Sequence, residues 1–205
     1  MNNTKNNPML MQQVVTNDIV QVLETRNIHF NKAFTREYCY EIIDLLDKVR
    51  TYDNLMNTPK EELYIRLTLC TEGGSILALF SLLEVIEKLK EIGYTVHTHC
   101  NSMAASCGFV LFCGGNHRTV SEFAFLLNHQ GSSMTRGTVR EMEVDLRFTK
   151  MLESKINDYL RANTDMAEEE IARPYVTNTD IWYNAQECVD TVSYTHLTLP
   201  TILLV

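Results

Sequence analysis

The chain has 205 residues, which is enough for one domain with a substantial hydrophobic core and leaves little room for a second. Its net charge of −8 excludes a general nucleic-acid-binding protein, because the sequence has no basic stripe to neutralise phosphates. No apolar run approaches about 18 residues, and the N-terminus lacks the apolar core of a secretory signal. We therefore expect a cytoplasmic protein with no membrane-spanning segment.

The cysteines and histidines are spaced for neither a disulfide scaffold nor a metal site. Six cysteines, Cys39, Cys70, Cys100, Cys107, Cys113 and Cys188, are too scattered for a disulfide scaffold, so we expect reduced thiols. A zinc site would have to draw on His97, His99, Cys100, Cys113 and His117, whose spacing matches no standard zinc motif. The sequence therefore predicts no metal site.

The first part of the chain is predicted to alternate strands and helices after a polar arm. Residues 1–24 are expected to form a flexible N-terminal arm, followed by a short strand at 27–30. A helix capped by a threonine is predicted over residues 35–50, because its apolar residues recur at helical spacing. A polar connector at 51–60 then leads to an alternating strand at 63–70.

The same order is predicted to continue through the middle of the chain. A tight glycine turn at 71–74 precedes a strongly amphipathic helix over residues 75–92, which a further glycine ends. Residues 94–100 are predicted to form a strand, 107–113 a short apolar helix, and 118–127 more strand. Because strands alternate with helices, we expect parallel strands joined by helical crossovers, an α/β fold.

The last part of the chain is predicted to be mainly helical. A Gly- and Ser-rich loop at 131–137 leads into a long helix over residues 138–161. A shorter helix at 165–173 is expected to stop at the proline that follows. Residues 177–180 are expected to form a loop, and 184–189 a helical turn.

Ser106 and His129 form the most informative pair in the sequence. Ser106 lies in the segment MAASCG, whose small residues are typical of a tight turn that opens a helix and exposes the hydroxyl. His129 stands at the end of the next predicted strand, where it can reach that hydroxyl as a general base. Because the carboxyl ends of parallel strands meet at one edge of a sheet, we predict a serine hydrolase site there.

Further residues could complete such a site. Asp180, in a polar loop, is the candidate for the carboxylate that orients His129, although the same position also suits a simple turn residue. Gly73 and Gly74 let the backbone approach a substrate closely. The N–H groups of Gly74 and Cys107 are candidate donors to an oxyanion. We do not expect the Cys107 thiol to be the nucleophile, because the residue after a helix-opening nucleophile usually contributes its N–H.

These motifs together resemble one protein family over residues 28–190. The sequence has, in order, a Gly-Gly-Ser turn before an amphipathic helix, the segment MAASCG, a His-Gln pair, a long helix, and an aspartate before an Asn-Ala-Gln-Glu turn. Each motif alone is weak, but their order and spacing are similar to the proteolytic subunit of the Clp protease family (ClpP). The resemblance implies a ClpP/crotonase-like fold of repeated strand–strand–helix units, with residues 138–161 as a protruding handle helix.

The resemblance also implies roles for individual residues. It identifies Ser106, His129 and Asp180 as the nucleophile, base and carboxylate of a catalytic triad. It identifies Gly74 and Cys107 as the two oxyanion donors, beside Gly73 in the substrate-binding turn. We accordingly expect a serine endopeptidase.

Partners and cofactors are likewise implied by the resemblance. It implies homo-oligomeric, seven-membered rings stacked in pairs around a chamber that contains the active sites. It implies unfolded protein substrates delivered by a Clp-family AAA+ ATPase. ATP would be used by that partner only, so we expect no cofactor in this chain.

Three departures from the family pattern leave alternatives open. Thr71-Glu72 stands where the family usually has Ser-Pro, and Gly131 replaces an expected proline, so we expect altered peptide binding and a looser loop. Residues 193–205 fit nothing in the family and resemble translated adapter sequence; we therefore expect a domain over 25–192 followed by a non-native tail. Because the sequence departs from the family pattern in these places, two alternatives stay open. One is a phage prohead or capsid maturation protease, and the other is a catalytically silent ring subunit.

Overall fold

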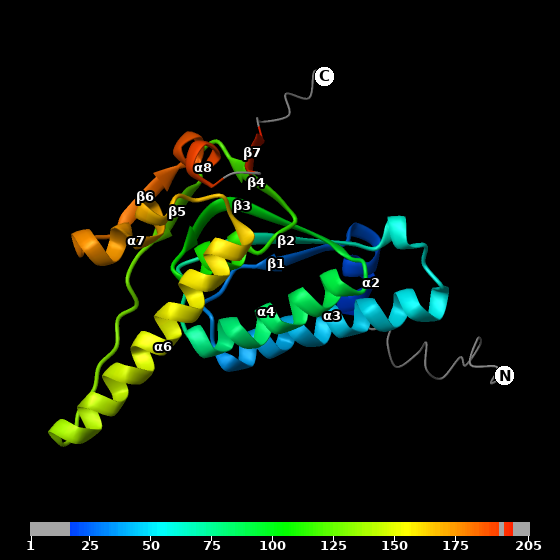
Figure 1. Cartoon of the computed structure of the whole chain (residues 1–205). Coiled ribbons are helices and arrows are strands. Elements are labelled where there is room, and N and C mark those ends of the chain that lie inside the picture. The colour runs from blue at the N-terminus through cyan, green and yellow to red at the C-terminus, as the bar shows by residue number, and fades with distance from the viewer. Residues whose placement is uncertain (1–16, 193–194, 199–205) are drawn as a thin grey trace.

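The computed structural model of the protein describes residues 17–192 and 195–198 (Figure 1). Its helices are α2 (Asn17–Thr25), α3 (Arg36–Met56), η1 (Lys60–Glu62), α4 (Ile76–Glu91), α5 (Cys107–Cys113), α6 (Val139–Asn163), α7 (Glu168–Thr177) and α8 (Ala185–Thr191). Its strands are β1 (Asn27–Phe30), β2 (Tyr64–Thr71), β3 (Thr95–Ala105), β4 (His117–Ser121), β5 (Phe125–Asn128), β6 (Ile181–Asn184) and β7 (Thr195–Thr198). Within the described part of the chain, no helix is long and apolar enough to cross a membrane.

The strands form one sheet that divides along β3. The main order is β1-β2-β3-β4-β7, and β5 pairs with both β3 and β6. Residues 97–100 of β3 pair with β4, whereas residues 103–105 pair with β5. Every pairing is parallel except that of β5 with β6. The α/β class predicted from the sequence is confirmed.

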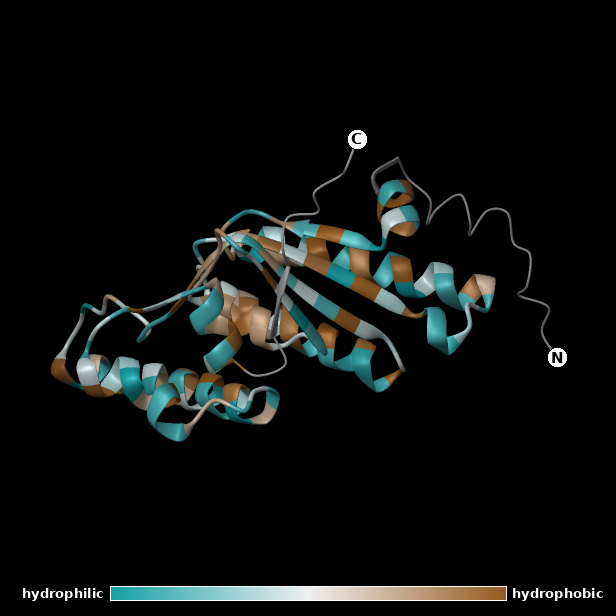
Figure 2. Cartoon of the chain, turned by 90° about the horizontal axis from the view of Figure 1, so that it is seen from above, coloured by the Kyte–Doolittle hydropathy of each residue, from teal (hydrophilic) through white to brown (hydrophobic). Residues whose placement is uncertain are grey.

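Helices α3 and α4 pack together below the sheet and bury their apolar faces against it (Figure 1). Along β2, Ile65, Leu67 and Leu69 are almost fully buried and alternate with more exposed residues. This alternation, visible as changing colours along the strands in Figure 2, follows from the two-residue period of a strand. The core below the sheet is therefore formed by every second residue of the strand, as the alternation of apolar residues in the sequence predicts.

Helix α3 is longer than predicted, because a buried carboxylate belongs to its last turns. It continues to Met56, and its Asp53 is only 2% exposed. The Arg26 guanidinium donates to both Asp53 carboxylate oxygens at 2.7 Å, and the hydroxyls of Tyr94 and Thr58 donate at 2.7 and 2.9 Å. The polar residues predicted as a connector are thus helical where tertiary contacts satisfy the buried charge.

The N-terminal arm is shorter than predicted. Residues 17–24 belong to helix α2, in which Ile19 is fully buried and Val22 is 8% exposed against the body of the protein. These two residues stand three apart, so they share one face of the helix and can both reach the core. The flexible-arm prediction is therefore wrong for residues 17–24, and residues 1–16 lie outside the described part.

Three other boundaries differ from the predictions. Strand β3 runs on to Ala105, because its second half finds a new partner in β5 despite residues of low strand propensity. Strand β6 (Ile181–Asn184) lies between the loop predicted at 177–180 and the predicted helical turn, where no strand was predicted, and its residues alternate in burial. Helix α7 continues through Pro174 to Thr177, so the proline does not end it.

Helix α6 leaves the body of the protein and extends far from the sheet (Figure 1). A capping box formed by Thr138 and Glu141 starts it. All 25 residues of α6 are described, and Leu160, in its last turns, is the one that is buried. The long helix predicted from the sequence is present, and it protrudes as the family resemblance implied.

The C-terminal tail is described only in part. Residues 195–198 form strand β7, which pairs in parallel with β4 at the edge of the sheet. Residues 193–194 and 199–205 lie outside the described part. The idea that 193–205 is non-native stays a prediction.

Candidate active site

Ser106 lies on a sharp turn between β3 and α5. Its φ of 57° and ψ of −119° fall in a region that residues with a side chain rarely adopt, at a cost of about 1–3 kcal/mol. Two contacts hold the turn: the Ser106 N–H donates to the Leu127 carbonyl at 2.9 Å, and the Ser106 carbonyl accepts from the Phe109 N–H at 3.0 Å. Because α5 is buried along its whole length, packing keeps the strained turn in place.

His129 reaches Ser106 because β3 and β5 run parallel and end together. Ala105 pairs with Leu127, so the residues that follow these two strands leave the sheet at the same edge. His129 Nε2 lies 2.8 Å from Ser106 Oγ. With the ring proton on Nδ1, the hydroxyl donates to Nε2, which is the arrangement that a general base requires.

Asp180 is brought to His129 by the antiparallel strand β6. The register pairs Asn128 with Ile181, so the residue after β5 and the residue before β6 are neighbours. Asp180 Oδ1 lies 3.5 Å from His129 Nδ1, and the Asp180 side chain is 60% exposed. This distance exceeds that of an ordinary hydrogen bond, about 2.7–3.2 Å, so the pair is in contact but not tightly aligned.

The Gly73-Gly74 turn packs directly against the Ser106 turn. Gly73 has a φ of 99°, and a Cβ there would lie 2.6 Å from Ser106 Cβ. Gly74 has a φ of 144°, and a Cβ there would lie within 2.7–3.1 Å of the Phe34 backbone. Both positions therefore require glycine, for conformation and for space.

The two candidate oxyanion donors lie on either side of this contact. In the described part of the chain, neither the Gly74 N–H nor the Cys107 N–H donates to a backbone carbonyl, and the acceptor beside both is the Cys107 sulfur. The Gly73 N–H instead donates to Thr71 Oγ1 at 3.2 Å. Gly73 thus shapes the turn, while the N–H groups of Gly74 and Cys107 meet only a weak sulfur acceptor, which an oxyanion can displace.

The Cys107 side chain is structural. It is 2% exposed, and its Sγ donates to the Gly74 carbonyl at 3.2 Å. Burial raises the pKa of this thiol to about 11, so it stays protonated at neutral pH. A nucleophilic role for the thiol is therefore disfavoured, as the sequence predicted.

Ser106 and His129 open into a cleft of about 420 Å³. One wall comes from the glycine turn and the start of α4, and the other from the loop after His129 and one face of α6. The lining residues are Glu72, Gly74, Ser75, Ile76, Leu77, Ser106, Leu127, His129, Gly131, Ser132, Ser133, Thr149, Leu152 and Glu153. The sequence did not predict that α6 residues such as Thr149 and Glu153 line the cleft. No pattern within a helix shows which of its faces will meet a cleft.

Two of the three histidines that could have belonged to a zinc site, His97 and His99, contact hydroxyl groups instead. His97 Nδ1 lies 2.9 Å from the Tyr64 hydroxyl, and His97 Nε2 and His99 Nδ1 each lie 2.8 Å from Thr119 Oγ1. Among the residues that the structure describes, no three His, Cys, Asp or Glu side chains are grouped to hold a metal ion.

Comparison with known proteins agrees with this geometry. The Clp protease family model matches residues 11–191. The chain is 26% identical over 173 residues to the ATP-dependent Clp protease proteolytic subunit of Cyanophora paradoxa, covering 83% of each chain. It is also 26% identical over 189 residues to ATP-dependent Clp protease proteolytic subunit 2 of Treponema denticola, covering 92% of this chain and 86% of the relative. The chain, with its mixed sheet and helices, therefore belongs to the Clp protease family.

Proposed function

We propose that the protein is a serine endopeptidase whose nucleophile is Ser106. The observation that carries this proposal is the 2.8 Å contact between Ser106 Oγ and His129 Nε2, at a strained turn that faces a cleft. Strain of this kind concentrates at functional sites, and a purely structural serine would not need it. Family membership supports the same chemistry.

The reaction follows from the positions of the groups. Ser106 Oγ attacks the peptide carbonyl carbon while His129 Nε2 takes the hydroxyl proton. The carbonyl oxygen becomes an oxyanion, which the N–H groups of Gly74 and Cys107 can stabilise. His129 then gives the proton to the leaving amine, and the C–N bond breaks to leave an acyl-serine. Water, deprotonated by His129, hydrolyses this ester and restores the Ser106 hydroxyl.

Asp180 acts through His129. Its carboxylate favours the tautomer with the proton on Nδ1 and stabilises the imidazolium that forms during attack. The 3.5 Å separation leaves room to tighten, and catalytic hydrogen bonds often shorten only when substrate binds. We propose that substrate binding or assembly brings these two groups closer.

We further propose that the enzyme works as stacked rings served by an ATPase. The exposed apolar residues of α6 support assembly through this helix; they are Val139, Met142, Val144, Leu146, Phe148 and Met151. Seven-membered rings stacked through α6 would enclose the clefts, so that only unfolded chains reach them. The name of the relatives supports an ATP-dependent partner of the Clp AAA+ type. We propose that the assembly works in the cytoplasm.

A fluorophosphonate probe, which labels activated serines covalently, tests the proposal. We expect the purified protein to be labelled at Ser106 and to elute from native chromatography at ring size. Ser106→Ala should lose labelling and peptide hydrolysis while it keeps the same elution volume. Labelling that persists in Ser106→Ala would overturn the assignment of the nucleophile. Lack of labelling in a ring-sized wild-type protein would favour the catalytically silent subunit.

A further inference from the structure

Two carboxylates line the catalytic cleft together with Ser106 and His129. Glu72 stands at the end of β2, immediately before the glycine turn, and Glu153 lies on α6. Glu72 is exposed and Glu153 is partly buried. Two elements that are distant in the sequence therefore each contribute one acidic residue to the lining of the same cleft.

Among the described residues, no cation forms an ion pair with either acidic side chain. Within residues 17–192 and 195–198, no ion pair forms at Glu72 or Glu153, and no lysine or arginine lines the cleft. Other acidic residues do have partners: Glu168 binds Arg161, and Glu170 binds Arg173. The cleft is thus a place where a cation from a substrate would be favoured.

The rest of the lining is apolar enough to hold an aliphatic chain. Ile76, Leu127 and Leu152 line the cleft beside the polar loop. A Cβ added at Gly131 would meet Ile76 Cδ1 at an ordinary contact distance of 3.6 Å, so this loop runs along Ile76 without a side chain between them. A long side chain can lie along such a surface with its charged end near a carboxylate, as lysine and arginine commonly do.

We propose that the cleft selects peptides with lysine or arginine at the residue that supplies the scissile carbonyl, through Glu72 and Glu153. The aliphatic stem packs on the apolar lining, and the cationic end approaches the two carboxylates. The net charge of −8 adds attraction for basic segments at longer range. This inference rests on the proposed function, because it assigns the substrate class of the same site.

Peptidyl diphenyl phosphonates test the preference directly on the full chain in its native assembly. In these probes the serine oxygen attacks phosphorus and phenoxide leaves, so the rate of labelling reports the fit of one side chain. Lysine and norleucine probes differ only by the ammonium group. We expect the lysine probe to react faster, by about ten-fold at low salt, and the advantage to shrink as salt rises.

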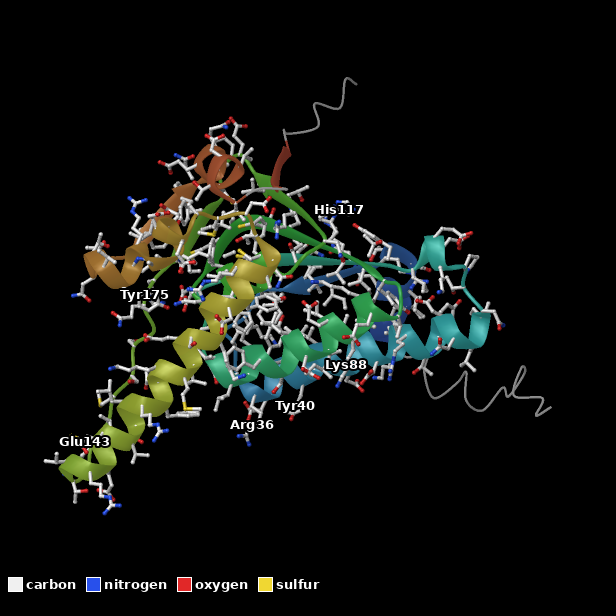
Figure 3. All side chains as sticks on the ribbon, viewed as in Figure 1. Arg36, Tyr40, Lys88, His117, Glu143 and Tyr175 are labelled. Carbon is white, nitrogen blue, oxygen red and sulfur yellow. The ribbon has the colours of Figure 1, made fainter. Side chains whose placement is uncertain are left out.

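Neutral variants locate the origin of this preference. Glu72→Gln and Glu153→Gln should each reduce the lysine-to-norleucine ratio by about three- to five-fold, and the double variant should bring it near one. Glu143→Gln is the matched control, because it removes the same charge from the same helix near the tip of α6, away from the body of the protein (Figure 3). That control should leave the ratio unchanged.

The outcomes separate the two proposals. Equal rates with both probes in the wild type, or a ratio that the double variant does not change, would overturn the basic preference while serine catalysis stands. A ratio lowered equally by Glu143→Gln would also overturn it, because the net charge of the chain would then suffice. Failure of both phosphonates and of the fluorophosphonate to label Ser106 would overturn the proposed function, and the preference with it.

Discussion

At the carboxyl edge of the sheet, backbone contacts within one chain hold the candidate site, whereas helix α6 leaves the body with most of its apolar side chains in solvent. Both regions contain apolar residues at regular spacing, and Figure 2 shows brown and teal interleaved along the strands and along α6 alike. The difference lies in what covers those residues. The sheet edge is held within the monomer, whereas none of the described residues covers the apolar side chains on the outer part of α6.

The largest expected effect comes from the site itself. His129→Ala should lower kcat/KM for peptide hydrolysis by about 10⁴-fold, because it removes the group that takes the proton of Ser106. The fold should be unchanged, since the His129 ring lies at the edge of the cleft. Steady-state kinetics and circular dichroism measure the two properties. His29→Ala, on an exposed part of β1, is the control, and a similar loss there would contradict the assignment.

The next largest effect is a loss of folding stability at the end of α6 that packs against the body of the protein. Leu160→Ala should lower the free energy of unfolding by about 3 kcal/mol, because Leu160 is 1% exposed and its loss leaves a cavity. Urea denaturation followed by circular dichroism measures this change. A loss below about 0.5 kcal/mol would mean that α6 is not anchored to the core at this residue.

The sheet should also make the fold sensitive to acid. Burial, with the nearby Arg66 charge adding to it, lowers the pKa of His97 and His99 from 6.5 to about 4. Between these pH values the unfolded chain binds more protons than the folded chain, so the free energy of unfolding falls as the pH drops from 6.5 to 4. We expect about 1–2 kcal/mol from each histidine, less than the full shift implies, because both rings keep some contact with solvent.

Urea denaturation across this pH range measures that dependence. Replacing both histidines with glutamine should flatten the fall in stability between pH 6.5 and 4. His29→Gln is the control, because this exposed residue lies on β1 and is not among the groups that lower the pKa of His97 or His99. An unchanged pH profile in the double variant would show that other groups cause the acid sensitivity.

The smallest effect on folding is expected on the outer part of α6. Leu146→Ala matches Leu160→Ala in chemistry and in helix, but Leu146 is 55% exposed. For the dissociated chain, we expect the free energy of unfolding to change by less than about 0.5 kcal/mol. Native chromatography should nevertheless reveal weaker assembly. If the stability loss equalled that of Leu160→Ala, the comparison between the two regions would fail.

Much of the site was predictable because its signals are local and because parallel strands impose a common edge. The small residues around Ser106 indicated a turn, and the strand before His129 indicated where that residue would lie. The structure brings the two side chains within hydrogen-bond distance and places Asp180 beside them. The catalytic roles of these residues stay predictions until a variant is assayed.

Other features depend on pairings that no local pattern reveals. Asp53 looks like a connector residue in the sequence, yet it is buried because Arg26 and Tyr94 meet it from elements far along the chain. Glu153 looks like one charge among many on a long helix, yet its face of α6 lines the cleft. In both cases the environment of a carboxylate is set by distant residues.

By itself, the sequence determined the α/β class, the glycine turn, the serine turn and the long helix over residues 138–161, because periodicity and turn chemistry act over a few residues. That this helix protrudes was implied by the family resemblance. Only the tertiary structure decided the antiparallel register that sets Asp180 beside His129, the contact of the glycine turn with Ser106, and the two carboxylates that share the cleft. The reason is physical: strand register and helix placement are settled by burial of the whole core, which sums contacts between residues far apart in the chain.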